Sequence, residues 1–424
     1  MDIQIFPPEE LIDVTIDLPL SKSVFNRLLI MEALAGKPVR PMLSGSSDDV
    51  NALINGLNYR YNDSINVGAA GTTMRFLTAF YAVTPNVDII IDGSDRMRKR
   101  PIAPLVDALN SLGAEISYVD EEGYPPLHIQ GKELEGGTVD LKASVSSQFI
   151  TALMLVAPYM TNGLTINLEG NVVSGSYIHL TKKLQQRCGI DTEIEDRQIR
   201  IPHGNYLITQ DILEKDWTSA SYWAQIVALS AGFVNLTGLS VANDCQGDKN
   251  IIHFFEPLGV SISQDEASEI VEMCAHPDLN GHLELDLSDN PDLGQTLAVT
   301  CCLLRIPFQF TGLSTLVIKE TNRIEALKNE LLKFGCIVES PNNDSLSWDG
   351  RIFPIQDVPA IDTYEDHRMA LSFAPAALYF PGLIINDSEV VTKSYPTFWD
   401  DLKKAGFEIN PIEYRHSKEE TAYN

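Results

Sequence analysis

Residues 329–339 read NELLKFGCIVE, a helical pattern that ends at Gly335 and continues as an alternating strand pattern. Glycine ends a helix in the left-handed conformation at the least cost. The pattern returns along the whole chain, with Asn58 in the glycine position of the first copy; the copies are residues 52–61, 107–116, 183–192, 254–262, 329–339 and 401–409. We expect left-handed backbone at each of these glycines and also at Asn58, because asparagine is the next residue to tolerate it.

The spacing of the copies predicts an internal repeat. Gly113, Gly189, Gly259, Gly335 and Gly406 are 76, 70, 76 and 71 residues apart, whereas the first copy is shorter. A helix followed by a strand is common in any α/β protein, but regular spacing favours a repeat. Units of this length are too long for a solenoid and suit two domains of three units each, with a boundary near residue 215. A chain of 424 residues predicts two domains on length alone.

The composition excludes several classes of protein. The formal net charge of −27, from 31 basic and 58 acidic residues, argues against a nucleic-acid partner, which needs a basic face. The N-terminus lacks the pattern of a secretory signal, and the longest apolar stretch, residues 369–384, contains two prolines and is too short to cross a bilayer. The spacing of the six cysteines fits neither a disulfide scaffold nor a zinc site. We expect a cytoplasmic protein that binds no metal.

Three polar motifs stand where helices should begin. Residues 21–23 (SKS) precede one helix, residues 71–75 (GTTMR) a second and residues 144–148 (SVSSQ) a third. A helix N-terminus offers unpaired N–H groups and the positive end of the helix dipole, and hydroxyl side chains add donors, so each motif is a candidate anion site. Serine and threonine are also the usual helix caps, and capping alone would explain any one of the three.

The second half of the chain supplies charged groups that capping does not need. Lys319 and Arg323 are four residues apart, so they share one face if the segment is helical, with Glu320 beside them. Residues 366–368 (DHR) put three ionisable side chains at the start of an apolar helix, where unused charges would be costly. We therefore expect a functional role for both segments.

Two further charged residues flank predicted elements. Asp292 leads into another apolar helix, and Lys393 follows residues 389–391 (EVV), which have the composition of a strand. Basic residues are the minority in this acidic chain, so a cluster of them would steer anionic substrates to one place.

Taken together, these motifs resemble the EPSP synthase family, the 3-phosphoshikimate 1-carboxyvinyltransferases. The resemblance covers almost the whole chain, and the order and spacing of the motifs make it specific. The matching motifs are SKSVFNR (21–27), AGTTMR (70–75), RMRKRPI (96–102), SSQ (146–148), SGSY (174–177), QGD (246–248), Asp292, KETNR (319–323), DHRMA (366–370) and KSYP (393–396).

The resemblance implies an α/β fold of two similar domains with a cleft between them. Each domain would contain three βαβαββ units arranged as an inverse α/β barrel, which gives a six-fold internal repeat. Because the family's chain crosses between its domains twice, residues 1–19 plus 216–424 would form one domain and residues 20–215 the inserted one. The crossings would lie near residues 18–21 and 214–217, in agreement with the boundary predicted from the repeat.

The resemblance also implies an activity. It is the transfer of the enolpyruvyl group of phosphoenolpyruvate to the 5-hydroxyl of shikimate 3-phosphate, with release of phosphate, in the shikimate pathway of aromatic amino-acid biosynthesis. These two small molecules would be the only partners, without nucleic acid or membrane. The enzyme would be a cytoplasmic monomer that needs no cofactor.

The family's site residues carry over to matching positions. The residues expected at shikimate 3-phosphate are Lys22, Ser23, Arg27, Ser146, Ser147, Ser174, Tyr177, Asp292 and Lys319. The residues expected at phosphoenolpyruvate are Lys22, Gly71, Arg96, Gln148, Arg323, His367, Arg368 and Lys393. The residue types fit, because arginine suits carboxylate, and lysine and hydroxyl groups suit phosphate.

The implied reaction needs two proton transfers. One is at the attacked hydroxyl and the other at C3 of phosphoenolpyruvate. By the resemblance, Asp292 is the candidate base for the hydroxyl, and Glu320, assisted by Lys22, acts at C3. An alternative for Asp292 is that it only caps the helix that follows it.

Departures from the family's pattern leave these roles untouched, and two rival functions stay open. Ala69 and Thr315 stand where asparagine occurs in other members, and Asn322 replaces an aspartate. One rival, UDP-N-acetylglucosamine enolpyruvyltransferase, shares the fold, but its reactive cysteine has no counterpart in residues 92–101. The other rival, a non-catalytic anion-binding protein, would have no use for intact proton-transfer residues.

Overall fold

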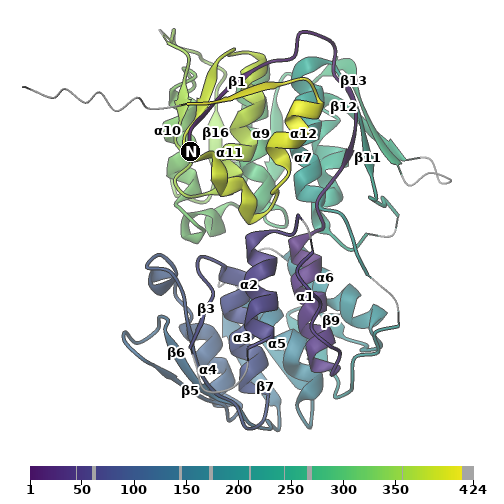
Figure 1. Cartoon of the computed structure of the whole chain (residues 1–424), viewed down its shortest axis with the longest axis vertical. Coiled ribbons are helices and arrows are strands. Elements are labelled where there is room, and N and C mark those ends of the chain that lie inside the picture. Colours follow the sequence, from purple (N-terminus) through teal and green to yellow (C-terminus); the bar gives the residue numbers. More distant parts are fainter. Residues whose placement is uncertain are drawn as a thin grey trace, which may run out of the picture.

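The computed structural model describes residues 1–43, 45–59, 64–142, 146–170, 175–209, 212–242, 244–264, 270–355 and 357–412. Helices and strands alternate through them, and every named sheet contains both parallel and antiparallel pairs, so the fold is mixed α/β. Figure 1 shows two stacked groups of elements. We call residues 21–214 the first lobe and residues 1–20 with 215–412 the second lobe.

The first lobe has its own hydrophobic core, formed by side chains from residues 24–212 together with Cys245. Its helices are α1 (Lys22–Leu34), α2 (Asp48–Leu57), α3 (Gly71–Ala82), α4 (Ala103–Ser111), α5 (Ser147–Val156) and α6 (Gly175–Arg187). One sheet has the order β3 (Ser64–Asn66), β4 (Asp88–Asp92), β6 (Leu127–Gln130), β5 (Glu115–Tyr118). The other has the order β7 (Gly137–Lys142), β8 (Leu164–Glu169), β10 (Gln198–Ile201), β9 (Glu193–Glu195).

The second lobe has a separate core, formed by residues 3–18 and 217–407. Its helices are α7 (Trp217–Ser230), α8 (Ile251–Phe255), α9 (Gly294–Leu304), α10 (Arg323–Leu332), α11 (His367–Phe373) and α12 (Phe398–Lys404). Its sheets, in strand order, are β2 (Asp13–Asp17), β11 (Phe233–Thr237), β13 (Ile270–Leu279), β12 (Leu258–Gln264); β14 (Leu283–Asp286), β15 (Phe308–Thr311), β16 (Leu346–Trp348); and β17 (Ala360–Ile361), β18 (Leu383–Ile385), β1 (Ile3–Phe6), β19 (Glu408–Pro411).

The helices form the interior of each lobe. Almost every residue of α5, α7 and α9 is buried, as expected for helices with apolar or small side chains on all faces. The strands alternate instead: Val139 and Leu141 of β7 are buried, and Asp140 and Lys142 are exposed. The sheets therefore cover the helices with one face and meet solvent with the other.

One strand order recurs among the sheets. In β3-β4-β6-β5, β7-β8-β10-β9 and β2-β11-β13-β12, a parallel pair is extended by the fourth strand in sequence and then by the third, both antiparallel. The sheet β14-β15-β16 follows the same scheme, because Glu339 pairs with Ser347 at the free edge of β16.

The left-handed backbone predicted at the five glycines is confirmed, but Gly259 lies inside β12 and not at the end of a helix. The φ angles of Gly113, Gly189, Gly259, Gly335 and Gly406 lie between 80° and 96°. The prediction for Asn58 is wrong: its φ is −80°, because its N–H still donates to the Ile54 carbonyl (3.0 Å) as in a helix. Residues 60 and 61, the end of the strand predicted after it, lie outside the described residues.

The chain passes between the lobes at two segments that lie side by side. Leu20 and Lys215 form an antiparallel bridge. The Ser21 N–H donates to the Glu214 carbonyl (2.8 Å), and the Asp216 N–H donates to the Pro19 carbonyl (3.0 Å). The covalent connection between the lobes is therefore one short two-stranded segment.

A buried carboxyl group stands beside this connection. Asp244 is 7% exposed, and its Oδ2 accepts hydrogen bonds from Trp217 Nε1 (2.7 Å) and the Ser240 N–H (2.8 Å). Burial raises the pKa of Asp244 to about 6, because a carboxylate without hydration is less stable than the neutral acid.

We expect Asp244→Asn to stabilise the protein at pH 7. An unfolded aspartate titrates near pH 4, so the raised native pKa costs stability as the pH rises from about 4 to about 6. The asparagine oxygen can keep both hydrogen bonds without a charge. The free energy of unfolding in urea should exceed that of wild type by about 1–3 kcal/mol at pH 7 and match it near pH 4. Equal stability at pH 7 would contradict a buried charge.

Candidate active site

A cavity of about 260 Å³ is lined by side chains of both lobes. The predicted residues found in its wall are Lys22, Ser23, Arg27, Gly71, Ser146, Ser147, Gln148, Tyr177, Asp292, Lys319, Glu320, Arg323, His367 and Arg368. Residues far apart in the sequence are thus brought together in one place.

The first turns of α1, α3 and α5 contribute to the cavity wall. As predicted, α1 begins at the 21–23 motif, α3 at Gly71 and α5 at Ser147. The Ser21 hydroxyl caps α1 by accepting from the Val24 N–H (3.5 Å), and the Ser146 hydroxyl caps α5 by accepting from the Gln148 N–H (3.3 Å). Capping and anion binding are compatible here, because other N–H groups of these turns stay available.

Gly71 allows a cation to approach the start of α3. A Cβ atom at this position would lie only 2.5 Å from Nη1 of Arg100, so any other residue would displace that guanidinium group. Gln148 also lies beside this helix start, where its Nε2 donates to Thr72 Oγ1 (3.2 Å).

Two arginines of the wall are buried without an acidic partner within 4 Å among the described residues. Arg27 is 3% exposed and donates to Thr181 Oγ1 (2.8 Å) and the Ser23 carbonyl (2.7 Å). Arg75 is also 3% exposed and donates to the Pro101 carbonyl (3.0 Å). Burial lowers the pKa of Arg27 to about 10, so it is still charged at neutral pH. A buried cation is costly alone, and an anionic ligand would supply the missing counter-charge.

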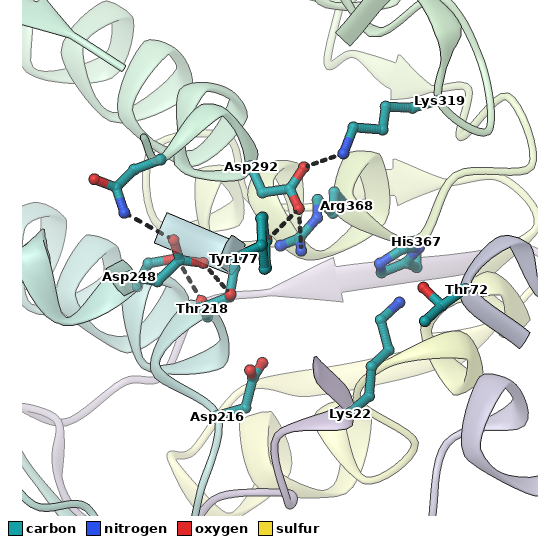
Figure 2. A network of polar contacts seen from close by, with 12 residues as sticks. Lys22, Thr72, Tyr177, Asp216, Thr218, Asp248, Asp292, Lys319, His367 and Arg368 are labelled. Carbon is teal, nitrogen blue, oxygen red and sulfur yellow. Dashed lines mark hydrogen bonds and ion pairs between the residues drawn. The ribbon is translucent and has the colours of Figure 1, made fainter. Parts of the chain in front are cut away.

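Asp292 is surrounded by cations. Its carboxylate lies 2.8 Å from Arg323 Nη1, 3.2 Å from Arg368 Nη2 and 3.4 Å from Lys319 Nζ. Tyr177 of the first lobe donates its hydroxyl to the same carboxylate (2.9 Å), as Figure 2 shows. Burial alone would raise the pKa of Asp292, but Arg368, Lys319 and Arg323 together hold it well below its usual range. Asp292 is therefore ionised.

Glu320 is the second ionised carboxylate of the wall. It lies 2.9 Å from Arg323 Nη2 and 3.3 Å from Lys393 Nζ. Burial would raise its pKa, but Lys393 and Arg323 hold it well below the usual range. Anionic ligands that attract these cations would weaken this effect, and the pKa of the carboxyl group would rise toward the range needed for proton transfer.

Lys22 and Lys393, from different lobes, share one carboxylate. Lys22 Nζ lies 3.0 Å from Asp49 Oδ2, and Lys393 Nζ lies 4.0 Å from Asp49 Oδ1. Asp49 is 4% exposed, so this pairing is protected from solvent. The two lysines are therefore close enough to contact one multiply charged anion together.

The start of α11 places His367 and Arg368 in the wall. Asp366 caps the helix by accepting from the Arg368 N–H (2.9 Å), and Arg323 Nε holds it at 2.6 Å. His367 is 1% exposed, and neither ring nitrogen has a hydrogen-bond partner among the residues that the structure describes. Burial, together with Lys22 and Arg368, holds the pKa of His367 well below its usual range. The neutral ring can offer a ligand one donor and one acceptor.

Three predicted residues are not part of the described wall. Arg96 is exposed, and its Nε–H donates to the Glu320 carbonyl of the other lobe (2.9 Å). Lys393 donates to the Ala69 carbonyl (3.0 Å) in addition to its contact with Glu320. Ser174 lies outside the described residues. Arg96 and Lys393 thus connect the lobes beside the cavity.

The condition for a shared face of Lys319 and Arg323 is not met: Lys319 is extended (φ −80°, ψ −151°), because α10 begins only at Arg323, where the Asn322 side chain caps it. Both side chains nevertheless reach Asp292. Lys393 does not follow a strand, since residues 388–393 form a 3₁₀ turn. Periodicity cannot distinguish so short an apolar run from a helical turn.

The alternative that Asp292 only caps its helix fails. The N-cap of α9 is Leu293, without a side-chain hydrogen bond. The Asp292 carboxylate contacts the three cations instead, which a capping role does not require.

Two residues that line the cavity, Asp49 and Arg100, have no sequence pattern that predicts a place there. Asp49 stands in the first turn of α2, where acidic residues are common because they complement the helix dipole. Its pairing with Lys22 is a tertiary contact that no sequence pattern predicts. Arg100 belongs to a motif that matches the family, but that motif gave it no role.

None of the helices in the described part of the chain has both the length and the hydropathy to span a bilayer. A mixed α/β fold with a cavity of paired cations, buried arginines and ionised carboxylates defines an enzyme that acts on small anions. The family model for EPSP synthase (3-phosphoshikimate 1-carboxyvinyltransferase) matches residues 14–402. The chain belongs to the EPSP synthase family.

Relatives from several bacteria agree with this assignment. The 3-phosphoshikimate 1-carboxyvinyltransferase of Bacteroides fragilis is 46% identical over 404 residues, which cover 94% of this chain and 96% of the relative. The enzyme of the same name from Vibrio cholerae is 34% identical over 427 residues, covering 93% and 97%. The structure of EPSP synthase from Acinetobacter baumannii shares the fold, with a TM-score of 0.74, 21% identity and coverage of 97% and 100%.

Proposed function

We propose that this chain transfers the enolpyruvyl group of phosphoenolpyruvate to the 5-hydroxyl of shikimate 3-phosphate, the reaction for which its relatives are named. The observation that carries the proposal is the pair of buried arginines, Arg27 and Arg75, which have no acidic partner within 4 Å in the part of the chain that the structure describes. The same wall contains the ionised carboxylates of Asp292 and Glu320. Such a wall fits anionic substrates that must also exchange protons.

The two substrates are assigned to different parts of the wall. For shikimate 3-phosphate, the proposed contacts are Lys22, Ser23, Arg27, Ser146, Ser147, Ser174, Tyr177, Asp292 and Lys319. For phosphoenolpyruvate, they are Lys22, Gly71, Arg96, Gln148, Arg323, His367, Arg368 and Lys393. The three helix starts supply N–H donors for phosphate, and the arginines supply paired donors for carboxylate.

The proposed chemistry is an addition followed by an elimination. The substrate's 5-hydroxyl oxygen attacks C2 of phosphoenolpyruvate as Asp292 accepts the hydroxyl proton, and C3 gains a proton through Glu320, assisted by Lys22. Phosphate then leaves C2 while Glu320 removes a proton from C3, which restores the double bond. Substrate anions that draw cations away from Asp292 and Glu320 would raise the pKa of both carboxyl groups when they are needed.

We further propose two domains, residues 1–19 plus 216–424 and residues 20–215, each of three βαβαββ units around an inverse α/β barrel. The two separate cores and the recurring strand order support this architecture. The free cysteines fit a cytoplasmic enzyme. The proposed functional form is a monomer.

Phosphate release tests the proposed function. The purified chain should release phosphate from phosphoenolpyruvate when shikimate 3-phosphate is present, and not with UDP-N-acetylglucosamine in its place. Release only with the nucleotide sugar would favour the rival transferase, and release with neither would favour a non-catalytic binding protein.

Arg27→Ala should weaken the binding of shikimate 3-phosphate far more than the binding of phosphoenolpyruvate. The buried guanidinium is assigned to one substrate only, and the loss of a charge-assisted pair should raise the dissociation constant of that substrate about tenfold or more. Calorimetry with each ligand measures this difference. If the binding of both ligands weakens equally, the assignment of Arg27 to shikimate 3-phosphate is wrong.

A further inference from the structure

Two residues next to the cavity have a backbone conformation that neither favours. Tyr364 and Glu365 have φ angles of 54° and 58°, and no other adjacent pair of non-glycine residues in the described ranges is left-handed. This conformation persists only where the surroundings hold it. Asp366, His367 and Arg368 follow at once, so the direction of this turn decides where the start of α11 lies.

Helix α10 holds the turn at both ends. Glu330 is fully buried and accepts hydrogen bonds from the Tyr364 hydroxyl (2.8 Å) and the Asp362 N–H (3.1 Å). Seven residues earlier, on the same face of α10, Arg323 holds Asp366. One rigid helix therefore fixes the residues before and after the strained pair.

Glu330 itself does not line the cavity. Lys333 neutralises its carboxylate (2.7 Å), and the Lys333 Nζ also donates to the Ala360 carbonyl (2.8 Å). A buried carboxylate with a full set of partners stabilises many folds without any part in function. Its two contacts with the strained turn distinguish it from such a residue.

We propose that Glu330 is a positioning residue for phosphoenolpyruvate. It keeps Tyr364 and Glu365 left-handed and thereby places His367 and Arg368 in the cavity wall. The inference rests on the proposed function for the identity of the ligand, and on the geometry alone for the effect on the turn.

Glu330→Gln tests the proposal. The change replaces one acceptor oxygen with an NH₂ donor and removes the charge that is paired with Lys333. Either the NH₂ group then opposes the Asp362 N–H, or the Tyr364 hydroxyl must turn and accept instead of donating. We expect kcat/KM for phosphoenolpyruvate to fall about tenfold. The KM for shikimate 3-phosphate should change less than about twofold, since most of its proposed contacts lie in the first lobe.

A second substitution separates positioning from general stability. Adding Glu365→Gly should restore most of the lost kcat/KM, because glycine adopts the left-handed conformation without support. Asp196→Gly is the matched control: Asp196 is exposed, lies between β9 and β10 and has a φ of 48°. This substitution relieves the same kind of left-handed backbone strain far from the turn. It should therefore not restore the kcat/KM that Glu330→Gln loses.

Wild-type kinetics in Glu330→Gln, no recovery with Glu365→Gly, or equal recovery with Asp196→Gly would each overturn the proposal. Should Glu330→Gln fail to fold, Tyr364→Phe deletes one of the same hydrogen bonds and should show the same loss and rescue; its failure to do so overturns the proposal too.

Hydrogen exchange of residues 362–369 follows the turn independently of catalysis. Exchange should be faster in Glu330→Gln than in wild type, and unchanged exchange would also reject the proposal. A wild-type chain that releases no phosphate would instead contradict the proposed function.

Discussion

Glu320→Gln should lower the turnover number about 100-fold or more while both substrates still bind. The amide nearly preserves the shape of the carboxylate, but it cannot take part in proton transfer at C3. Removal of one negative charge beside Arg323 and Lys393 should leave these cations available to anions, so binding should be equal or tighter. Phosphate release measures the turnover, and calorimetry measures the binding.

Glu325→Gln is the matched control for this variant. Glu325 carries the same side chain in the first turn of α10 but pairs with Lys328 (2.7 Å) and lies outside the cavity wall. It should retain wild-type turnover. If the turnover number of Glu320→Gln stays within about threefold of wild type, Glu320 is not the group that transfers the proton.

Local features of this fold were predictable because local physics determines them. Glycine is the residue that best ends a helix in left-handed geometry, and Gly113, Gly189, Gly335 and Gly406 do so, whereas Gly259 is left-handed inside β12. The helix starts at residues 22 and 147 follow from serine caps before apolar runs, whereas the helix that starts at Gly71 has Ala70 at its N-cap and no side-chain cap. These starts then put Lys22, Ser23, Gly71, Ser146, Ser147 and Gln148 in one wall, since anion-binding groups cluster at helix N-termini.

Tertiary contacts account for what the sequence did not predict. Asp49 looks like an ordinary first-turn acid, and only the folded chain brings it to Lys22. The pattern of residues 389–391 favours a strand, but the chain forms a 3₁₀ turn that buries Val391. The left-handed pair at Tyr364 and Glu365 has no sequence signal at all, because neither residue type prefers that conformation.

Asp292→Asn separates a catalytic base from a structural counter-ion. If Asp292 only balances Lys319, Arg323 and Arg368, the neutral amide should free those cations for substrate anions and leave turnover near wild type. If Asp292 accepts the hydroxyl proton, turnover should fall about 100-fold or more although binding is equal or tighter. We expect the second result, because Tyr177 orients the carboxylate across the lobes and capping does not explain its position.

The control for this variant is Asp289→Asn, a change three residues earlier at an exposed side chain outside the cavity wall. It should leave both turnover and binding unchanged. In Asp292→Asn, the dissociation constants of shikimate 3-phosphate and phosphoenolpyruvate from calorimetry must be compared with the turnover number from phosphate release. Weaker binding of both ligands would mean that the carboxylate organises the three cations rather than competing with substrate for them. Tighter binding with lost turnover would establish two effects of the same negative charge: it weakens substrate binding in the ground state, and it accepts the hydroxyl proton in the reaction.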